Sequence, residues 1–227
     1  IQNVLGTLPL DWKHIKIDPN KIKICTYWLL YETQTAAMIF DAYVAAENGD
    51  YSGLAFLSYS WDEEVGSREF WCEYFSKALS CGLDTSRNLV KEMEPPGTII
   101  GSPSAKLFFG AASQGGWPIK SIPEKYRKMD NCEVETLVLM GNLDPSSPLE
   151  YIQEIMPYFK KGQLVILCDM GHMDSCNLQP DAFNHLGERF FSKGIVDTSK
   201  YVYNKISFKP EKTYLDYAQE LLKNKKK

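Results

Sequence analysis

Two short, nearly continuous apolar runs constrain the fold of this chain more than any other feature. They occupy residues 134–140, which are followed by Gly141, and residues 164–168. Runs of this length are typical of strands that are buried on both faces of a parallel sheet. A strong helix start lies between them, with a capping serine, a proline at the first helical position and a glutamate three residues after the cap: Ser147, Pro148 and Glu150.

The helices around these runs complete a repeating order. The first helix carries apolar residues at helical spacing, with Gly162 just beyond its expected end: Ile152, Ile155, Met156 and Phe159. A loop at residues 169–179 follows the second run, and the next helix carries four residues that we expect to face a core: Phe183, Leu186, Phe190 and Phe191. Strand, helix, strand, helix is the order of a parallel sheet covered by helices on both faces, so the sequence predicts an α/β fold.

The first half of the chain has helical rather than strand patterning. Apolar residues recur at helical spacing over residues 33–48 and 67–80, with Gly49 and Gly82 as left-handed stops. Residues 97–123 are rich in Gly, Pro and Ser and indicate a connector. The first of these helices is expected to present one apolar face: Ala36, Ala37, Ile39, Phe40, Tyr43 and Val44.

Composition excludes several classes of protein. The net charge is −4, from 25 lysines and arginines against 29 aspartates and glutamates, so nucleic-acid binding is not favoured. The longest mainly apolar run, residues 24–31, is far shorter than the roughly 20 residues that a membrane-spanning helix needs. The hydrophobic content of 44% is typical of a globular protein rather than a disordered one.

Six cysteines occur without any C-x-x-C pair, which argues against a zinc ribbon or a thioredoxin-type site. Cys72 and Cys168 lie among apolar residues, so we expect both to be buried, while disulfide pairing and the cellular compartment stay open. Cys168, His172 and Cys176 have the spacing C-x-x-x-H-x-x-x-C, with Asp169 and Asp174 beside them, so a zinc site is an alternative. Because Cys168 would have to turn out of a buried strand, we expect neither a metal nor a cofactor.

Two polar side chains follow the apolar runs, where catalytic groups gather in α/β proteins. Asp144 comes three residues after Gly141, and His172 directly follows Gly171. Loops at the carboxyl ends of neighbouring parallel strands meet at one edge of the sheet, so we expect the two side chains to lie together. An aspartate that accepts a hydrogen bond from an imidazole fixes its tautomer, and the other ring nitrogen can then act as a general base.

Each residue taken alone also has a structural interpretation. An aspartate before a proline is a common turn residue, and a Gly-His pair after a strand is ordinary. The joint placement of Asp144 and His172 favours a catalytic pair. The other histidines are weaker candidates, because His185 is expected on the solvated side of its helix and His14 lies in an irregular segment.

The segment around Asp144 and His172 resembles the last part of an α/β-hydrolase, most of all the proline iminopeptidase and tripeptidyl aminopeptidase group. The resemblance rests on ETLVLMGNLDPSSPLEYIQEIMPYF and GQLVILCDMGHMDSC. In that family the aspartate of the Ser-His-Asp triad stands in a G-x-x-D-x-x-x-P pattern and the histidine in a G-H pair, matched here by Gly141, Asp144, Pro148, Gly171 and His172. The resemblance covers residues 134–208, and the helical stretch before them is similar only in general character to the family's cap.

The nucleophile of the family is missing from this chain. It is the serine of a G-x-S-x-G elbow between a strand and a helix, and no such motif occurs here. The nearest segment, A-A-S-Q-G around Ser113, is followed by Gly116, Trp117 and Pro118 where a helix is required. We therefore expect the nucleophile and its strands to be encoded upstream, in a longer protein of which this chain is a part.

Three regions are predicted: a mainly helical cap region at 1–125, the C-terminal part of the hydrolase core at 126–209, and a C-terminal amphipathic helix with a lysine-rich tail at 210–227. The resemblance implies a serine hydrolase of peptidase or esterase type, with aminopeptidase-like activity as one form of it, with Asp144 and His172 as acid and base and no activity in the isolated chain. The alternative is a non-catalytic binding or interaction module with a hydrolase-like shape. Expected partners are a small-molecule or peptide substrate and, at the open sheet edge, the missing N-terminal half or a second copy.

Overall fold

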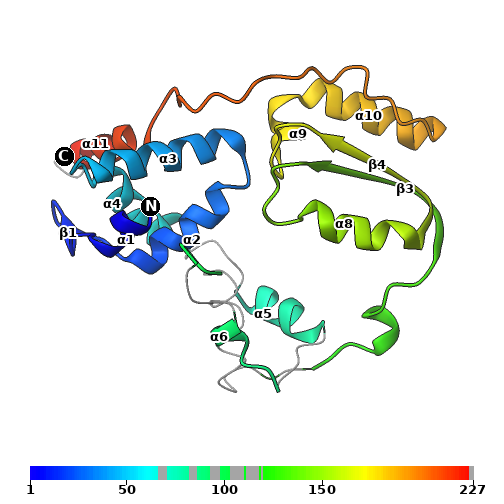
Figure 1. The fold of residues 1–227 in the computed structure, drawn as a ribbon, viewed down its shortest axis with the longest axis horizontal. Coiled ribbons are helices and arrows are strands. Elements are labelled where there is room, and N and C mark those ends of the chain that lie inside the picture. The colour runs from blue at the N-terminus through cyan, green and yellow to red at the C-terminus, as the bar shows by residue number, and fades with distance from the viewer. Residues whose placement is uncertain are drawn as a thin grey trace. The chain divides into compact units, whose positions relative to one another are not determined.

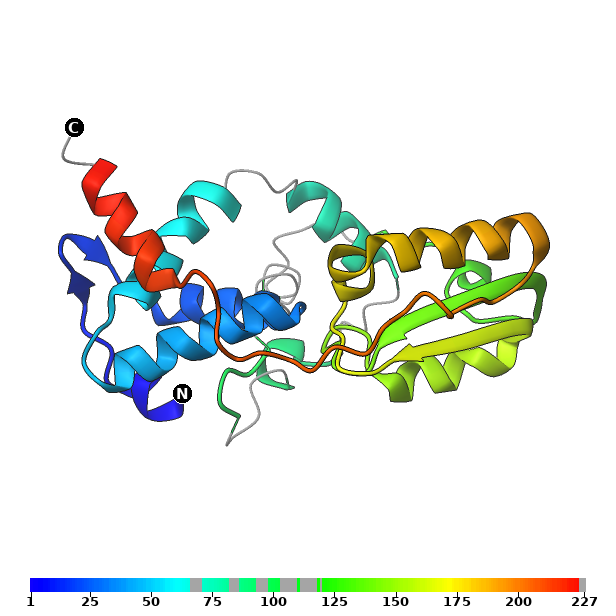
Figure 2. The ribbon, with the colours of Figure 1, turned by 90° about the horizontal axis from the view of Figure 1, so that it is seen from above.

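The computed structural model describes residues 1–65, 71–81, 86–92, 98–102, 110, 118 and 120–224 (Figures 1 and 2). The chain divides into two compact units. The helical unit comprises Ile1–Trp28, Met38–Lys128 and Glu211–Lys227, and the sheet unit comprises Leu29–Ala37 and Met129–Pro210. Among the described helices, none combines the length and the apolar character that crossing a membrane requires.

The sheet unit is built around two parallel strands, β3 (Cys132–Gly141) and β4 (Phe159–Leu167). Helix α8 (Leu149–Ile155) connects them, and α9 (Asp174–Leu178) and α10 (Pro180–Lys193) follow β4. Figure 1 shows α8 on one face of the sheet and α10 on the other. The predicted α/β class, with its order of strand, helix, strand, helix, is confirmed.

The helix between the strands ends earlier than the sequence pattern predicts. Helix α8 stops at Ile155, a 3₁₀ turn follows at Met156–Tyr158, and Phe159 is already the first residue of β4. Pro157 explains the difference, since its ring cannot be accommodated inside an α-helix and its nitrogen has no hydrogen to donate. Gly162, expected just beyond the helix, instead pairs with Thr136 inside the sheet.

The predicted serine cap of α8 is also wrong. The residue in the cap position is Pro148, and no side chain caps the helix. The backbone nitrogen of Ser147 donates to Asp144 Oδ1 at 3.2 Å, so this serine belongs to the turn around the aspartate. A local aspartate turn here competes with an earlier helix start.

The sheet unit is less buried than its apolar runs predict. Val134 in β3 is 67% exposed, and Phe191 in α10 is 88% exposed, although both were expected to face a core. Phe183 is exposed as well, and α10 buries Ala182 and Leu186 instead. In the described part of the chain the sheet has only two strands, so it is too narrow to cover these apolar faces.

The helical unit contains the remaining described elements. They are α1 (Gln2–Gly6), β1 (Asp11–Trp12), β2 (Ile15–Lys16), α2 (Pro19–Leu29), α3 (Thr33–Glu47), α4 (Ser52–Ser60), a π-helix at Trp61–Val65, α5 (Trp71–Ser80), α6 (Leu89–Glu92), a 3₁₀ turn at Glu124–Tyr126 and α11 (Tyr214–Asn224). Strands β1 and β2 pair antiparallel as a short hairpin. The first turn of α3 and the last residue of α2 belong to the sheet unit.

The core of the helical unit lies between α2, α3 and α4. Ile22, Ile39 and Leu54 contribute fully buried side chains from these three helices. The C-terminal helix α11 packs against α4, where the ring of Phe56 stacks on that of Tyr217 with centroids 5.5 Å apart. The predicted region boundaries, after residue 125 and after residue 209, stay predictions. The described structure adds only that α11 belongs to the helical unit.

The first predicted helix is confirmed as α3, and Gly49 after it has the expected left-handed backbone, with φ +93°. Its predicted apolar face is partly wrong, because Phe40 and Val44 are exposed. The face that is buried consists of Ala37, Ile39, Ala42, Tyr43 and Ala46. Of the second predicted helix, Trp71–Ser80 is observed as α5, and residues 66–70 and Gly82 lie outside the described residues.

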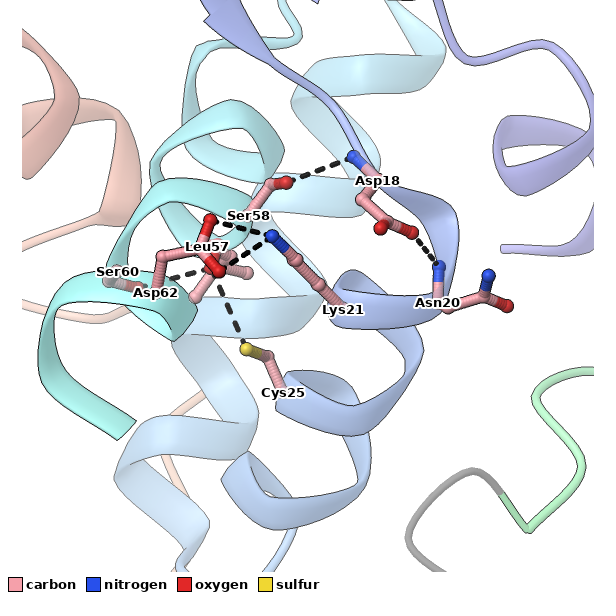
Figure 3. Close-up of polar contacts among 8 residues, drawn as sticks. All are labelled: Asp18, Asn20, Lys21, Cys25, Leu57, Ser58, Ser60 and Asp62. Carbon is pink, nitrogen blue, oxygen red and sulfur yellow. Dashed lines mark hydrogen bonds and ion pairs between the residues drawn. The ribbon is translucent and has the colours of Figure 1, made fainter. Parts of the chain in front are cut away.

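Polar contacts connect α2 to α4 and the π-helix (Figure 3). The ammonium of Lys21 lies 2.6 Å from both carboxylate oxygens of Asp62, and the backbone nitrogen of Asp18 donates to Ser58 Oγ at 2.9 Å. The thiol of Cys25 donates to the carbonyl oxygen of Leu57 at 3.6 Å. These contacts hold together elements that are distant in sequence.

Candidate active site

The structure brings Asp144 and His172 together. Asp144 lies in the loop after β3 and His172 in the loop after β4, and Asp144 Oδ2 is 2.7 Å from His172 Nδ1. The side chain of Asp144 is 4% exposed, whereas that of His172 is 41% exposed. The imidazole therefore has one edge against a buried carboxylate and the rest accessible from solvent.

The second carboxylate oxygen of Asp144 is held by its own turn. Asp144 Oδ1 accepts hydrogen bonds from Ser146 N at 2.8 Å, from Ser146 Oγ at 2.6 Å and from Ser147 N at 3.2 Å. Burial raises the pKa of the Asp144 carboxyl, but the hydrogen bonds from the Ser146 hydroxyl, His172 and the Ser146 backbone bring the pKa below its ordinary value. Asp144 is therefore a carboxylate that remains ionised although little of it meets solvent.

The partners of the His172 ring define its tautomer. An ionised carboxylate can only accept a hydrogen bond, so the neutral imidazole next to Asp144 carries its proton on Nδ1. Nε2 receives no hydrogen bond from any residue that the structure describes, so its lone pair is available. A histidine in this state can accept a proton from a third group.

The His172 loop is fixed by the segment that precedes α3. The backbone nitrogen of His172 donates to the carbonyl oxygen of Tyr31 at 2.6 Å, and the Tyr31 ring meets the imidazole edge to face with centroids 5.5 Å apart. Gly171 is required for this approach, because a Cβ at that position would lie 2.2 Å from the Tyr31 oxygen. The G-H pair thus has a steric reason as well as a chemical one.

A buried carboxylate that the sequence indicated only as a neighbour of the alternative zinc site supports the same loop. Asp174 is completely buried, and its Oδ2 accepts hydrogen bonds from Gly171 N at 2.7 Å and from Thr33 N at 3.1 Å. An aspartate at the start of a short helix is a usable sequence signal for such a role. Its partner Thr33 lies 141 residues away, and no local pattern predicts that contact.

The two loops are also tied directly to each other. Asn142 Oδ1 accepts a hydrogen bond from Asp169 N at 2.7 Å, and Leu143 N donates to the carbonyl oxygen of Met170 at 2.9 Å. Gly141 permits this approach, because a Cβ there would lie 2.0 Å from the Met170 oxygen. The positions of Asp144 and His172 are therefore coupled through one side-chain and one backbone hydrogen bond between their loops.

The other sequence candidates have different places. His185 is not solvated as predicted, because its Nε2 lies 3.1 Å from Asp197 Oδ2. Hydrogen bonds from Ser199 and from His185 hold the pKa of Asp197 well below its ordinary value. His14 lies in the exposed turn between β1 and β2, with φ +72°. Ser113, the weak candidate for the nucleophile, lies outside the described residues.

The cysteines do not form the alternative zinc site. All six thiols are unpaired, and Cys72 and Cys168 are exposed rather than buried as predicted. Cys168 turns outward because β4 ends at Leu167, one residue before it. Cys176 Sγ donates to the carbonyl oxygen of Met173 at 3.1 Å. Within the described residues, no three side chains of His, Cys, Asp or Glu are arranged to hold a metal ion.

Comparison with known proteins supports the resemblance in part. Residues 110–202 match the family described as TAP-like protein, which is an α/β-hydrolase family, and both Asp144 and His172 lie within the match. No curated protein and no solved structure matches the chain. The chain therefore contains an α/β-hydrolase-like domain of partial α/β fold with a mainly helical cap region, and the match indicates a hydrolase-like function.

Proposed function

We propose that this chain supplies the acid and the general base of a serine hydrolase. Asp144 orients the imidazole and stabilises its protonated form, and His172 Nε2 accepts the proton of the nucleophile. The observation that supports this proposal is the 2.7 Å contact between Asp144 Oδ2 and His172 Nδ1, with the aspartate buried and the histidine half open to solvent.

The proposed reaction is hydrolysis of an amide or ester. A serine hydroxyl at Nε2 would lose its proton to His172 as its oxygen attacks the carbonyl carbon, and the imidazolium would then give that proton to the leaving group. Water would cleave the resulting acyl-enzyme by the same two proton transfers. The resemblance to the proline iminopeptidase and tripeptidyl aminopeptidase group supports a peptide substrate that is cleaved near its N-terminus.

The proposal places the nucleophile outside these 227 residues. The sequence has no G-x-S-x-G elbow, so the serine would come from another segment of a longer protein. That segment would also occupy the free edge of β3, which in the described part of the chain pairs only with β4. The exposure of Val134 supports an additional strand at this edge.

The experiment is a comparison of variants in the full-length natural protein. Aminoacyl anilides and p-nitrophenyl esters serve as substrates, and a fluorophosphonate probe reports the activated serine. Asp144→Asn and His172→Gln should each lower kcat by about 10⁴-fold, and the double variant should be little worse than the worse single variant. His185→Gln is the matched control and should retain activity, because its ring contacts Asp197 instead.

The same assay decides between this proposal and a non-catalytic module. Additive losses in the double variant would argue against a shared mechanism for Asp144 and His172. Absence of both turnover and probe labelling in the natural protein would favour a binding or interaction module of hydrolase-like shape. Turnover by the isolated 227-residue chain would show that its own residues include the nucleophile, and Ser113→Ala would then test the rejected elbow.

A further inference from the structure

We propose that Ser146 is a positioning residue, whose side-chain hydroxyl holds the Asp144 carboxylate and the His172 ring in one arrangement. Its oxygen lies 2.6 Å from Asp144 Oδ1 and 3.1 Å from His172 Nδ1. The inference rests on the proposed function of Asp144 and His172. It assigns a role to Ser146, which is neither the proposed acid nor the proposed base.

The direction of these hydrogen bonds follows from the chemistry of the groups. A serine hydroxyl has one proton and two lone pairs. Because the carboxylate can only accept, the Ser146 proton is donated to Asp144 Oδ1, which leaves a lone pair of Oγ directed to His172 Nδ1. The Nδ1 proton then has two acceptors, Asp144 Oδ2 at 2.7 Å and Ser146 Oγ at 3.1 Å.

This arrangement favours one tautomer of His172 for two reasons. With the proton on Nδ1, the Ser146 hydroxyl donates to Asp144, and the Nδ1–H donates to Asp144 and Ser146, so every donor has an acceptor. With the proton on Nε2, the Nδ1 lone pair would face the negatively charged Asp144 Oδ2, and the single Ser146 proton could be donated to Nδ1 or to Asp144 Oδ1 but not to both. Ser146 therefore adds to the preference that Asp144 alone imposes, and it keeps Nε2 in the state that accepts a proton.

The same geometry separates Ser146 from the role of nucleophile. Its oxygen contacts Nδ1, the nitrogen that faces the carboxylate, whereas a nucleophile needs Nε2. Its proton is also committed to Asp144 at 2.6 Å. Replacing Ser146 should weaken the positioning of the ring without removing the chemistry.

The contribution of the hydroxyl can be measured because the backbone of the turn remains when it is removed. Ser146 N and Ser147 N still donate to Asp144 Oδ1 in a Ser146→Ala variant. Ser147→Ala is a matched control at the next position, since the hydrogen bond of this residue to Asp144 comes from its backbone nitrogen. Both variants keep the backbone hydrogen bonds of the loop, so a difference between them reports the Ser146 hydroxyl.

The test is NMR spectroscopy of the full-length natural protein with ¹⁵N-labelled histidine. The His172 signals are identified by their loss in His172→Gln. Ser146→Ala should accelerate exchange of the His172 Nδ1 proton with solvent by about tenfold, the factor that corresponds to about 1.4 kcal/mol for a hydrogen bond in a charged network. It should also raise the pKa of the Asp144 carboxyl, measured by ¹³C, and Ser147→Ala should change neither quantity.

The outcomes separate this inference from the proposed function. If Ser146→Ala leaves the exchange rate of the His172 Nδ1 proton and the pKa of Asp144 unchanged, the role of Ser146 is overturned. A change of the His172 tautomer in Asp144→Asn would still support the proposed pairing of Asp144 with His172. An unchanged His172 spectrum in Asp144→Asn would overturn both. Ser146→Thr retains a hydroxyl, and restoration of slow exchange in this variant would support positioning by that group.

Discussion

Two short contacts of acidic side chains, one in each unit, show how differently a carboxylate can be used. In the helical unit Asp62 lies 2.6 Å from Lys21 (Figure 3), and the side chain of Asp62 is 59% exposed. In the sheet unit Asp144 lies 2.7 Å from His172 but is nearly buried. The distances are almost equal, so the difference lies in solvent and in the additional donors. Of these two carboxylates, only Asp144 has backbone and hydroxyl donors that replace water, and therefore only Asp144 of the two is suited to orient a partner with its charge.

The buried polar groups of the helical unit also serve a different purpose from those around His172 in the sheet unit. Thr26 Oγ1 and the Tyr43 hydroxyl lie 2.8 Å apart in the core, and the Cys25 thiol donates to a backbone carbonyl. Burial raises the pKa of Cys25 to about 12, so this thiol stays protonated and unreactive at neutral pH. Here polar groups satisfy one another and stabilise packing, whereas those of the sheet unit converge on a half-exposed imidazole.

The largest effect is expected from Gly171→Ala, because it disrupts the packing on which the site depends. The added methyl group would lie 2.2 Å from the Tyr31 carbonyl oxygen, so the loop must move away from the segment before α3. We expect a loss of about 3 kcal/mol in the free energy of unfolding and a changed His172 NMR signal. Urea denaturation and the histidine spectrum measure the two effects.

Gly187→Ala in α10 is the matched control for this substitution. Among the described residues, a Cβ at position 187 would meet no atom within 4 Å apart from its chain neighbours and the nearby backbone of its own helix, so the helix should gain about 0.5–1 kcal/mol from the better helix former. Equal effects of the two substitutions would show that the His172 loop is not tightly held. The proposed difference in packing between the His172 loop at Gly171 and the α10 surface at Gly187 would then be wrong.

A smaller loss is expected from Asp174→Ala, which removes a completely buried acceptor. The backbone nitrogens of Gly171 and Thr33 would lose their partner, and buried donors without partners destabilise proteins by about 2 kcal/mol. Asp174→Asn keeps one acceptor oxygen and should retain more of the stability. Urea denaturation of the two variants measures the difference, and equal stabilities would show that solvent reaches these nitrogens.

The pH dependence of stability tests the charge of Asp144. Its pKa is lowered in the folded chain, so its contribution is complete above the unfolded-state value of about 3.9 and is lost as the pH falls through the folded-state pKa. The stability difference between wild type and Asp144→Asn should therefore be largest near neutral pH and shrink in acid. Denaturation at a series of pH values measures it, and a difference that grows on acidification would contradict the assigned charge.

Sequence patterns predicted the sheet unit because its signals are local. The apolar runs locate β3 and β4, and Gly141 marks the end of β3. The same reasoning placed Asp144 beside His172, since both follow neighbouring parallel strands. Pro157 was a visible signal for the end of α8, and its effect outweighs the helical spacing that continues through Phe159.

The parts that were not predicted depend on contacts between distant segments. Asp174 contacts Thr33, which is 141 residues away in the sequence, and Tyr31 contacts His172 at a similar sequence separation. Burial was overestimated for Val134 and Phe191, because apolar character indicates what a side chain could pack against but not whether that surface is present. Ser146 is the exception, since it stands two residues after Asp144 and a local aspartate turn could have indicated it.

The exposed faces of the sheet unit lead to a prediction about association. Val134 and Phe191 are exposed, and among the described residues the outer edge of β3 has no strand partner. We expect the isolated chain to self-associate at concentrations on the order of tens of micromolar, and Val134→Lys to reduce association because a charge blunts a strand edge. Sedimentation velocity measures this, with Val44→Lys on the exposed side of α3 as control. A monomeric wild type would show that the edge is protected.

The smallest effect is expected for the exposed ion pair of Lys21 and Asp62, although its contact distance is close to that of Asp144 and His172. Lys21 and Asp62 are as close as Asp144 and His172, but solvent screens them, so their coupling should be about 0.5 kcal/mol. A double-mutant cycle of Lys21→Met and Asp62→Asn, followed by urea denaturation, isolates this coupling from the separate effects of each substitution. Raising the salt concentration to about 1 M should remove most of it. A coupling above about 2 kcal/mol that persists in salt would mean that the pair behaves as buried, and exposure would then no longer explain why only Asp144 of the two carboxylates is suited to orient a partner.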